Sequence, residues 1–471
     1  MMESPRENFG NDVFFMERGL LLEEIQGLID DICRTEVIPP EKIWEFTEFG
    51  YRELLIEVTH SSDLQSIFDL AVESAAQYPD DHRMRHLRDL LKLRMTMQSS
   101  DSALLELGRN ESCRTWHDDE HCVHAVPETI AGVPCYTAKA IFQGVLQWDQ
   151  RTWPNSDEDK KSALHRQTLS QLLAADKPPH LLLPECIAYV EDRTAMSSVE
   201  WVMTMPHGSR ESTNLVSLHQ LLSRAQERPT MDLRVALALK LAVSPRDILA
   251  VGWIQGATQS GHILFSYEQS SLLPDAGQRM GALPGSDLGK PIWLCFDYGR
   301  SYDDSVISWK MHDRTWDPYR WPTQQGRPPE AGTARKVHDI YAFGLLLLEI
   351  LHWEPLHKLV RLKSGPSASE ARNVRIRGEL LGKEPTSRLG GQNPVSKLEA
   401  DFPMYGFAVR SAIVAYGDEG MGVEEDIDES SIGIALFINR AFQQSVVERL
   451  QESLFSSDQK GVVMSSLFAL S

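Results

Sequence analysis

Apolar residues near the start of the chain recur at three- and four-residue steps. Leu20, Ile25, Leu28 and Ile32 follow this spacing, which is typical of one face of an α-helix. Similar patterns continue to about residue 108, with one interruption at Pro39-Pro40. The pattern predicts an α-helical N-terminal segment over residues 1–115.

From about residue 121 the pattern changes to short apolar runs bounded by Gly and Pro, which have the lengths of strands. Such runs occupy residues 180–184, 187–190 and 199–205, and one helix is predicted before them, over about 156–175. Longer helical patterns then return, at 216–225, 232–244, 337–352, 402–416 and 433–453. This order predicts an α+β fold, with a small β-rich region over about 125–207 and a large helical region over about 208–460.

Residues 83–94 combine a basic side with apolar residues at Met84, Leu87 and Leu91. The spacing predicts an amphipathic helix whose apolar side packs inside the protein. The alternative is a helix that lies on an anionic surface or in the groove of a partner.

Composition restricts the classes of partner. Of 471 residues 42% are hydrophobic, as in ordinary globular proteins. Lys+Arg of 47 against Asp+Glu of 67 gives 47 − 67 = −20, a net charge that disfavours broad binding to nucleic acids or anionic membranes. The six cysteines are scattered, which favours reduced thiols. No signal peptide is visible, and the longest apolar run, 341–351, contains Glu349 and is shorter than a membrane span of about 20 residues. We therefore expect a cytoplasmic protein without a transmembrane segment.

The most informative motif lies at residues 337–351. Val-His-Asp-Ile-Tyr-Ala-Phe-Gly-Leu-Leu-Leu-Leu-Glu-Ile-Leu resembles the Asp-[Val/Ile]-Tyr-Ser-Phe-Gly-x-x-Leu-Leu-Glu segment of protein kinases, which is the buried central helix of their C-lobe. In any buried helix, Asp339 could serve as an N-cap and Gly344 as a point of close packing.

Other segments resemble kinase elements and stand in the same order. Residues 199–208 resemble the fifth strand and the hinge, 215–223 the short helix after it, and 234–243 the long helix before the catalytic loop. The resemblance covers about 125–455. Trp353-Glu354-Pro355-Leu356, after the central helix, resembles divergent kinase-like proteins of filamentous fungi, which are often fused to helical HeLo-type (prion-inhibition and propagation) domains. The resemblance to kinases implies a bilobal protein-kinase-like fold.

The catalytic positions differ from those of kinases. Where kinases have His-Arg-Asp-x-x-x-x-Asn, the chain has Gln255-Gly256-Ala257 and then His262. Residues 292–300 resemble the strand and the Asp-Phe-Gly metal loop, with Asp297, Tyr298 and Gly299. Tyr319-Arg320-Trp321-Pro322 stands near the place where Ala-Pro-Glu closes the activation segment.

Phosphoryl transfer on this fold needs a Gly-rich loop, a Lys–Glu ion pair, a catalytic Asp, and Asn and Asp ligands for Mg²⁺. No Gly-rich loop precedes residue 140, and the helix at 160–175 has no acid. Lys139 is a candidate nucleotide lysine or else a surface lysine, and the run 145–149 fits the same strand pattern with Asp149 in the lysine position.

The remaining candidate residues do not supply the groups that phosphoryl transfer needs. Ala257 cannot accept a proton. His262 suits softer ions than Mg²⁺. Asp297 is a candidate nucleotide or metal ligand, or else a turn-forming Asx residue. The resemblance therefore implies a pseudokinase, a regulatory or scaffolding module of intracellular signalling that binds protein partners, with ATP as a weak ligand at most. The alternative is an unconventional ATP- and Mg²⁺-dependent Ser/Thr protein kinase.

Cys113, His117 and His121 are spaced so that they would share one face of a helix, as a zinc site could require. The spacing fits no standard Cys/His zinc finger, and the neighbouring Asp118-Asp119-Glu120 makes an exposed polar linker the better interpretation.

Overall fold

The computed structural model separates the chain into two units, Met1–Leu54 and Leu55–Ser471, and all the residues it describes belong to the second. The described residues are 61–77, 79, 82–98, 105–106, 126–130, 133–141, 169, 171–192, 198–204, 213–224, 228–256, 258–268, 287–294, 300–301, 317–325, 335–361, 376–383, 393–425, 427, 429 and 431–455. The helices expected before residue 61 lie outside them. The predicted domains 1–115, 125–207 and 208–460 stay predictions.

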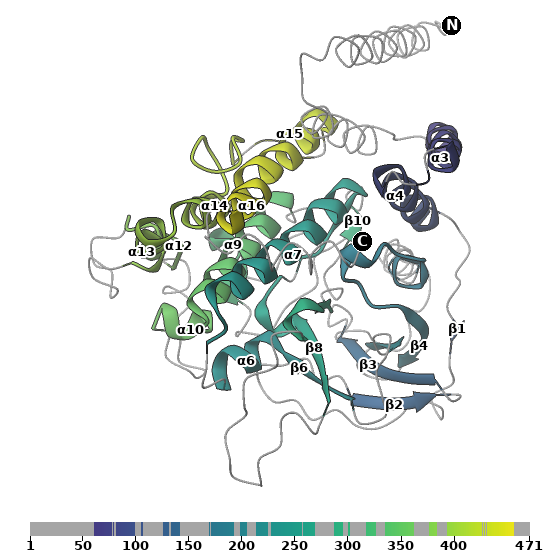
Figure 1. Cartoon of the computed structure of the whole chain (residues 1–471), viewed down its shortest axis with the longest axis horizontal. Helices are drawn as coiled ribbons and strands as arrows, with labels where there is room; N and C mark the ends of the chain where they lie inside the picture. Colours follow the sequence, from purple (N-terminus) through teal and green to yellow (C-terminus); the bar gives the residue numbers. More distant parts are fainter. Residues whose placement is uncertain are drawn as a thin grey trace, which may run out of the picture. The chain divides into compact units, whose positions relative to one another are not determined.

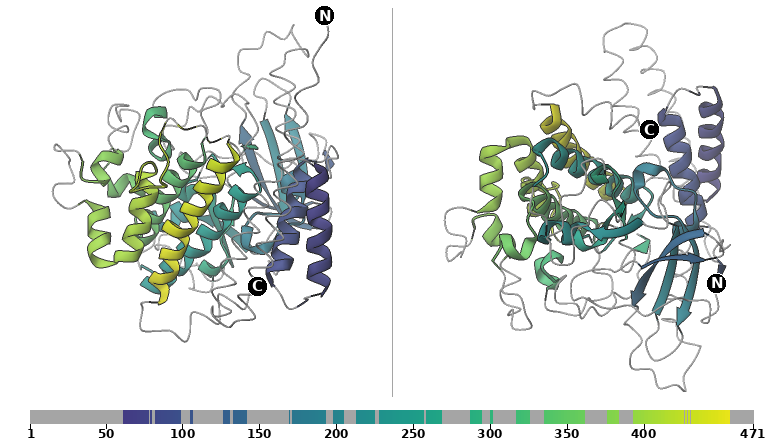
Figure 2. Two further views of the ribbon diagram at one scale, coloured as in Figure 1. Left: turned by 90° about the horizontal axis from the view of Figure 1, so that it is seen from above. Right: turned by 60° about the horizontal axis from the view of Figure 1, so that its bottom comes forward.

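Helices α3 (Ser61–Gln77) and α4 (His82–Gln98) pack side by side (Figures 1 and 2). The predicted basic amphipathic helix is α4. Its Leu87 and Leu91 are buried and its Lys92 is exposed, so the expectation that its apolar side packs inside the protein is confirmed for these leucines. The predicted helical segment is wrong at Leu105–Glu106, which forms the short strand β1.

Five strands form one sheet in the order β1-β4-β5-β3-β2. Besides β1, they are β2 (Val126–Ile130), β3 (Val133–Ile141), β4 (Cys186–Asp192) and β5 (Ser198–Thr204). All pairings are antiparallel except that of β1 with β4. The strands predicted at 187–190 and 199–205 are confirmed as β4 and β5.

The strand predicted at 180–184 is wrong. Residues Pro179–Leu181 form a short 3₁₀ helix, η2, and Leu182 follows with a φ of 58°. Pro178, Pro179 and Pro184 lack the backbone N–H that a strand donates to its neighbours. Leu181 and Leu182 are nevertheless buried, which explains why their apolar run resembled a strand.

Two smaller sheets follow. Strands β6 (Thr213–Ser217), β8 (Ile263–Glu268) and β9 (Ile292–Trp293) form one, with β8 in the middle. Strand β7 (Trp253–Ile254) pairs with β10 (Arg300–Ser301) in the other. The helix predicted at 216–225 begins only at Leu218, because Val216 and Ser217 belong to β6.

The rest of the described fold is mostly helical, so the chain is a mixed fold of helix and sheet. Its helices are α6 (Leu218–Arg224), α7 (Met231–Ala250), α9 (Lys336–His352), α10 (Leu356–Leu359), α12 (Ile376–Leu380), α13 (Pro394–Asp401), α14 (Pro403–Val414), α15 (Ile432–Phe442), the π-turn η7 (Gln443–Val447) and α16 (Glu448–Phe455).

Helix α7 extends beyond its predicted end. The prediction stopped before Pro245, but the helix continues through this residue to Ala250. Proline removes one hydrogen bond from a helix interior. Every residue from Ser244 to Val251 is buried, so packing around this turn offsets the lost bond.

Helix α9 is the centre of the helical part, as predicted for residues 337–352. Every residue from Asp339 to Leu351 is buried, and α9 packs against α7 and α14 (Figure 1). A helix that is apolar around its whole circumference belongs in a core. At Gly344, an added Cβ would lie 2.8 Å from the Cβ of Ala412, so the absence of a side chain lets α9 approach α14.

Candidate functional site

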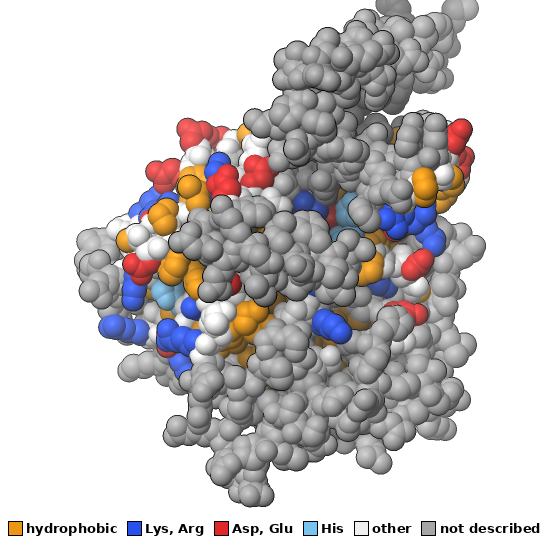
Figure 3. Space-filling view, viewed as in Figure 1, with side chains coloured by type: hydrophobic (Ala, Val, Ile, Leu, Met, Phe, Trp, Pro, Cys, Tyr) orange, Lys and Arg blue, Asp and Glu red, His pale blue; other side chains and the backbone are white. Residues whose placement is uncertain are grey.

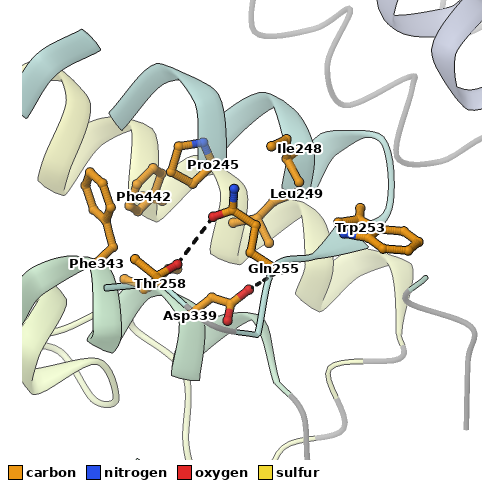
Figure 4. Close-up of a pocket in the computed structure, with 10 residues that line it drawn as sticks. Pro245, Ile248, Leu249, Trp253, Gln255, Thr258, Asp339, Phe343 and Phe442 are labelled. Atoms are coloured by element: carbon orange, nitrogen blue, oxygen red, sulfur yellow. Dashed lines mark hydrogen bonds between the residues drawn. The ribbon is translucent and has the colours of Figure 1, made fainter. Parts of the chain in front are cut away.

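The segment of greatest chemical interest is the 255–262 loop, which joins β7 to β8. Its start is fixed by Asp339, in the first turn of α9. One carboxylate oxygen accepts the amide of Gln255 at 2.7 Å (Figure 4). The other accepts the amide of Gly256 at 2.9 Å. Gly256 has a φ of +72°, a conformation that glycine adopts without strain. Two charge-assisted bonds to successive amides fix the backbone here.

The side chains of the loop bond to one another and to α6. The Thr258 hydroxyl donates to Oε1 of Gln255 at 3.3 Å (Figure 4). The Gln259 amide and the His262 ring lie 3.0 Å apart, nitrogen to nitrogen. The Ser260 hydroxyl lies 3.5 Å from Nδ1 of His219, on α6. These contacts join four side chains of the loop in two pairs and connect Ser260 to α6.

A small cavity lies behind the loop. It is lined by residues of α7, β7, the loop, α9 and α15, among them Pro245, Gln255 and Phe343 (Figure 4). Its volume is about 10 Å³, close to the roughly 10–15 Å³ that one water molecule requires. This cavity is therefore too small for a nucleotide.

A second carboxylate of α9 joins three segments. Oε1 of Glu349 accepts the Tyr319 hydroxyl at 2.7 Å and the Leu356 amide at 2.7 Å. Burial raises the pKa of Glu349 to about 7, although hydrogen bonds from Tyr319, Leu356 and Ser260 lower it. Burial, together with the charge of Glu349, raises the pKa of Tyr319 as well. Glu349 thus contacts three segments: the 255–262 loop, the Tyr319 segment and the segment after α9. The sequence patterns did not single out Glu349 as a site residue.

The Tyr319–Pro322 segment is also held by aromatic contacts. The Trp321 ring stacks on His338 with ring centroids 5.3 Å apart, and the Arg377 guanidinium lies 4.7 Å from the Trp321 ring. The Trp321 Nε1 donates to Glu425 at 3.0 Å. The Tyr319–Pro322 segment, which resembles the end of the kinase activation segment, is therefore packed against the start of α9.

His262 is buried at the end of the 255–262 loop, and its carbonyl accepts the amide of Leu294 at 2.9 Å. Leu294 stands three positions before Asp297 in the sequence. The structure therefore brings the end of the loop next to the end of β9.

Lys139 lies in β3, opposite Glu200 of β5. The alternative strand at 145–149 lies outside the described residues. The same is true of the other predicted site residues, which are Cys113, His117, His121, Ala257, Asp297 and Gly299.

Comparison of the chain with protein-family models and with curated proteins gives no match. Among the described helices, none has the length and apolar character to cross a membrane.

Proposed function

We propose that the chain is a kinase-fold regulatory or scaffolding module of intracellular signalling that binds protein partners and does not transfer phosphate. One observation carries the proposal. The backbone of the 255–262 loop is held in place, but the loop lacks the acidic residue that phosphoryl transfer requires. Asp339 fixes two successive amides of this loop. Yet no Asp or Glu occurs between Gly252 and Leu264, so the loop supplies no carboxylate to accept a substrate proton.

The arrangement of the elements supports the kinase-like part of the proposal. A sheet with antiparallel β2, β3, β5 and β4 precedes the helical part, which argues against a doubly wound parallel sheet. The long helix α9 is buried at the centre of the helical part. Segments that resemble the catalytic loop, the end of the activation segment and the residues after the central helix are bonded to α9.

The surface of α14 supports a role in protein binding. Met404 and Phe407 are spaced to lie on one face of this helix, with exposed fractions of 42% and 46%. Phe402, just before α14, is 38% exposed. Large exposed apolar side chains that lie together are typical of protein interfaces. On the face drawn in Figure 3, the described side chains include Lys and Arg as well as Asp and Glu.

The test of the proposal is a phosphoryl-transfer assay with labelled ATP and Mg²⁺ on the full chain. We expect transfer by the wild type to equal that of Asp297→Ala, with both at background. Asp401→Ala is the matched control, because Asp401 is exposed at the end of α13. Strong transfer that is lost in Asp297→Ala and retained in Asp401→Ala would contradict the proposal and favour an unconventional Ser/Thr kinase.

A nucleotide titration separates a partner-binding scaffold from a nucleotide-regulated module. A ligand at a hundredfold excess over its Kd stabilises the folded state by about 2.7 kcal/mol, which a thermal-shift assay detects. We expect Mg-ATP to raise the melting temperature little or not at all. A clear rise that is lost in Lys139→Ala and retained in the exposed control Lys290→Ala would show a working nucleotide site.

A further inference from the structure

A cluster of potential metal ligands lies away from the 255–262 loop. It comprises His86 of α4, His180 of η2 and the fully buried Asp247 of α7. The three residues come from segments far apart in the sequence, and the fold brings them together. Their ligand atoms all lie within 4.8 Å of one another.

The two imidazoles converge on one oxygen. Nε2 of His86 lies 3.2 Å, and Nε2 of His180 lies 3.1 Å, from Oδ2 of Asp247. The rings are neighbours, with centroids 4.2 Å apart and a tilt of 42°. Both Nε2 atoms are buried, and neither makes a hydrogen bond of acceptable geometry with a described group. Two buried nitrogens therefore face the same carboxylate oxygen at contact distance.

These separations fit a shared metal ion. Zinc binds imidazole nitrogen and carboxylate oxygen at about 2.0–2.2 Å, so two donors on one tetrahedral ion lie roughly 3.3–3.5 Å apart. The nitrogen-to-oxygen distances in the cluster are close to this, and a small rotation of the half-buried rings would admit the ion.

Asp247 is oriented by residues behind it. Arg246 donates through Nε to Oδ1 at 2.8 Å and through Nη2 to Oδ2 at 3.1 Å. Arg246 is itself held by Gln443 and Asn439. Hydrogen bonds of this kind behind a ligand fix its orientation. The positive charge of Arg246 also repels a cation, so the site should be weaker than a structural site with cysteine ligands.

We propose that His86, His180 and Asp247 bind one divalent transition-metal ion of the zinc class. Two imidazoles and one carboxylate are a common donor set for such ions. The ion would join α4 to α7 and η2, and would make the attachment of the α3–α4 helix pair dependent on metal. This inference does not depend on the proposed function.

The test uses the full chain without a polyhistidine tag, stripped with EDTA and dialysed against micromolar Zn²⁺. Bound metal is measured by mass spectrometry, and Co²⁺ is used as a spectroscopic probe, because a tetrahedral site gives intense visible absorption. We expect one bound ion in the wild type, a Zn²⁺-dependent rise in melting temperature, and an affinity at least about tenfold lower in His86→Ala and His180→Ala.

Two controls locate the ion. His357→Ala removes a histidine outside the cluster, and the double variant His117→Ala with His121→Ala removes the ligands that the sequence suggested. Both should retain the ion. The Co²⁺ spectrum of the wild type tests the site without any substitution, and urea unfolding of His180→Ala in EDTA checks that this variant is folded. No bound ion in the wild type, equal binding by His180→Ala, or loss of the ion in the double variant instead would overturn the proposal.

Discussion

The α9 region and the end of α7 both contain buried carboxylates, but their partners differ in kind. On α9, Asp339 accepts two backbone amides, and Glu349 accepts a tyrosine hydroxyl and an amide. On α7, Asp247 faces two imidazoles and one guanidinium. Backbone amides do not change charge, so the two bonds to Asp339 hold the start of the 255–262 loop in one arrangement. Imidazole nitrogens can bind metal, so the surroundings of Asp247 can respond to metal ions.

The largest expected effect comes from Asp247→Ala. This change leaves the Arg246 side chain, which is only 8% exposed, without its carboxylate. Removal of one partner of a buried ion pair costs about 3–5 kcal/mol. Urea unfolding in EDTA should show a loss of this size, whereas the exposed control Asp401→Ala should be nearly neutral. A loss of unfolding free energy below about 1 kcal/mol would mean that water readily reaches Arg246. The carboxylate of Asp247 would then not be part of a buried ion pair.

The second effect is a pH dependence from Glu349. Its pKa rises from 4.5 in the unfolded chain to about 7 in the fold, so the folded state binds more protons between these values. The free energy of unfolding should therefore fall as pH rises from 5 to 8, by about 2–3 kcal/mol from this group. Glu349→Gln should remove this contribution while retaining an acceptor for Tyr319.

The pH measurement compares urea unfolding at both values for the wild type, Glu349→Gln and the exposed control Glu419→Gln. Other groups titrate in the same range, so the informative quantity is the difference between variants. Equal slopes for the wild type and Glu349→Gln would contradict the raised pKa.

Asp339→Asn should have a smaller effect. Asparagine keeps one acceptor oxygen but turns an NH₂ group toward the other amide of the loop, at a cost of about 1–2 kcal/mol. Hydrogen exchange should accelerate at Gln255 and Gly256, whose amides bond to Asp339. Unchanged exchange at both amides would show that the loop is held by other contacts.

The smallest effect is expected for Lys92→Ala. Lys92 joins α4 to Asp176 at 3.1 Å, but the two side chains are 50% and 82% exposed. Exposed ion pairs contribute about 0–1 kcal/mol and weaken with salt. Urea unfolding should detect little change. A loss as large as that of Asp247→Ala would show that α4 depends on its surface contact and not on His86.

The local hydrophobic pattern predicted the elements whose formation depends on residues close together in the sequence. The apolar run of α9 and the strands β4 and β5 follow from residues next to one another in the sequence. Where prolines prevented the backbone pairing that an apolar run suggested, as before Leu181, the prediction was wrong. Packing overrode local rules in α7, where Pro245 indicated an end that buried neighbours do not allow.

The candidate site was only partly predictable for the same reason. Asp339 was recognisable because its motif is contiguous, and its pairing with Gln255 spans 84 positions. Glu349 gave no separate signal, since its partners Tyr319 and Leu356 are defined only by the fold. The cluster of His86, His180 and Asp247 has no sequence spacing that indicates metal binding, and the sequence suggested Cys113, His117 and His121 instead.

The bond between Asn439 and the carbonyl of Arg246 spans 193 positions, and it closes α15 over the end of α7 at a nitrogen-to-oxygen distance of 3.0 Å. During synthesis, at roughly 5–20 residues per second, α7 leaves the ribosome about 10–40 s before its partner. For that interval the apolar surface that α9, α15 and α16 later cover is exposed on the nascent chain. Chaperone binding to ribosome-bound chains should therefore be strongest after α7 has emerged and should end only when the C-terminal helices are complete.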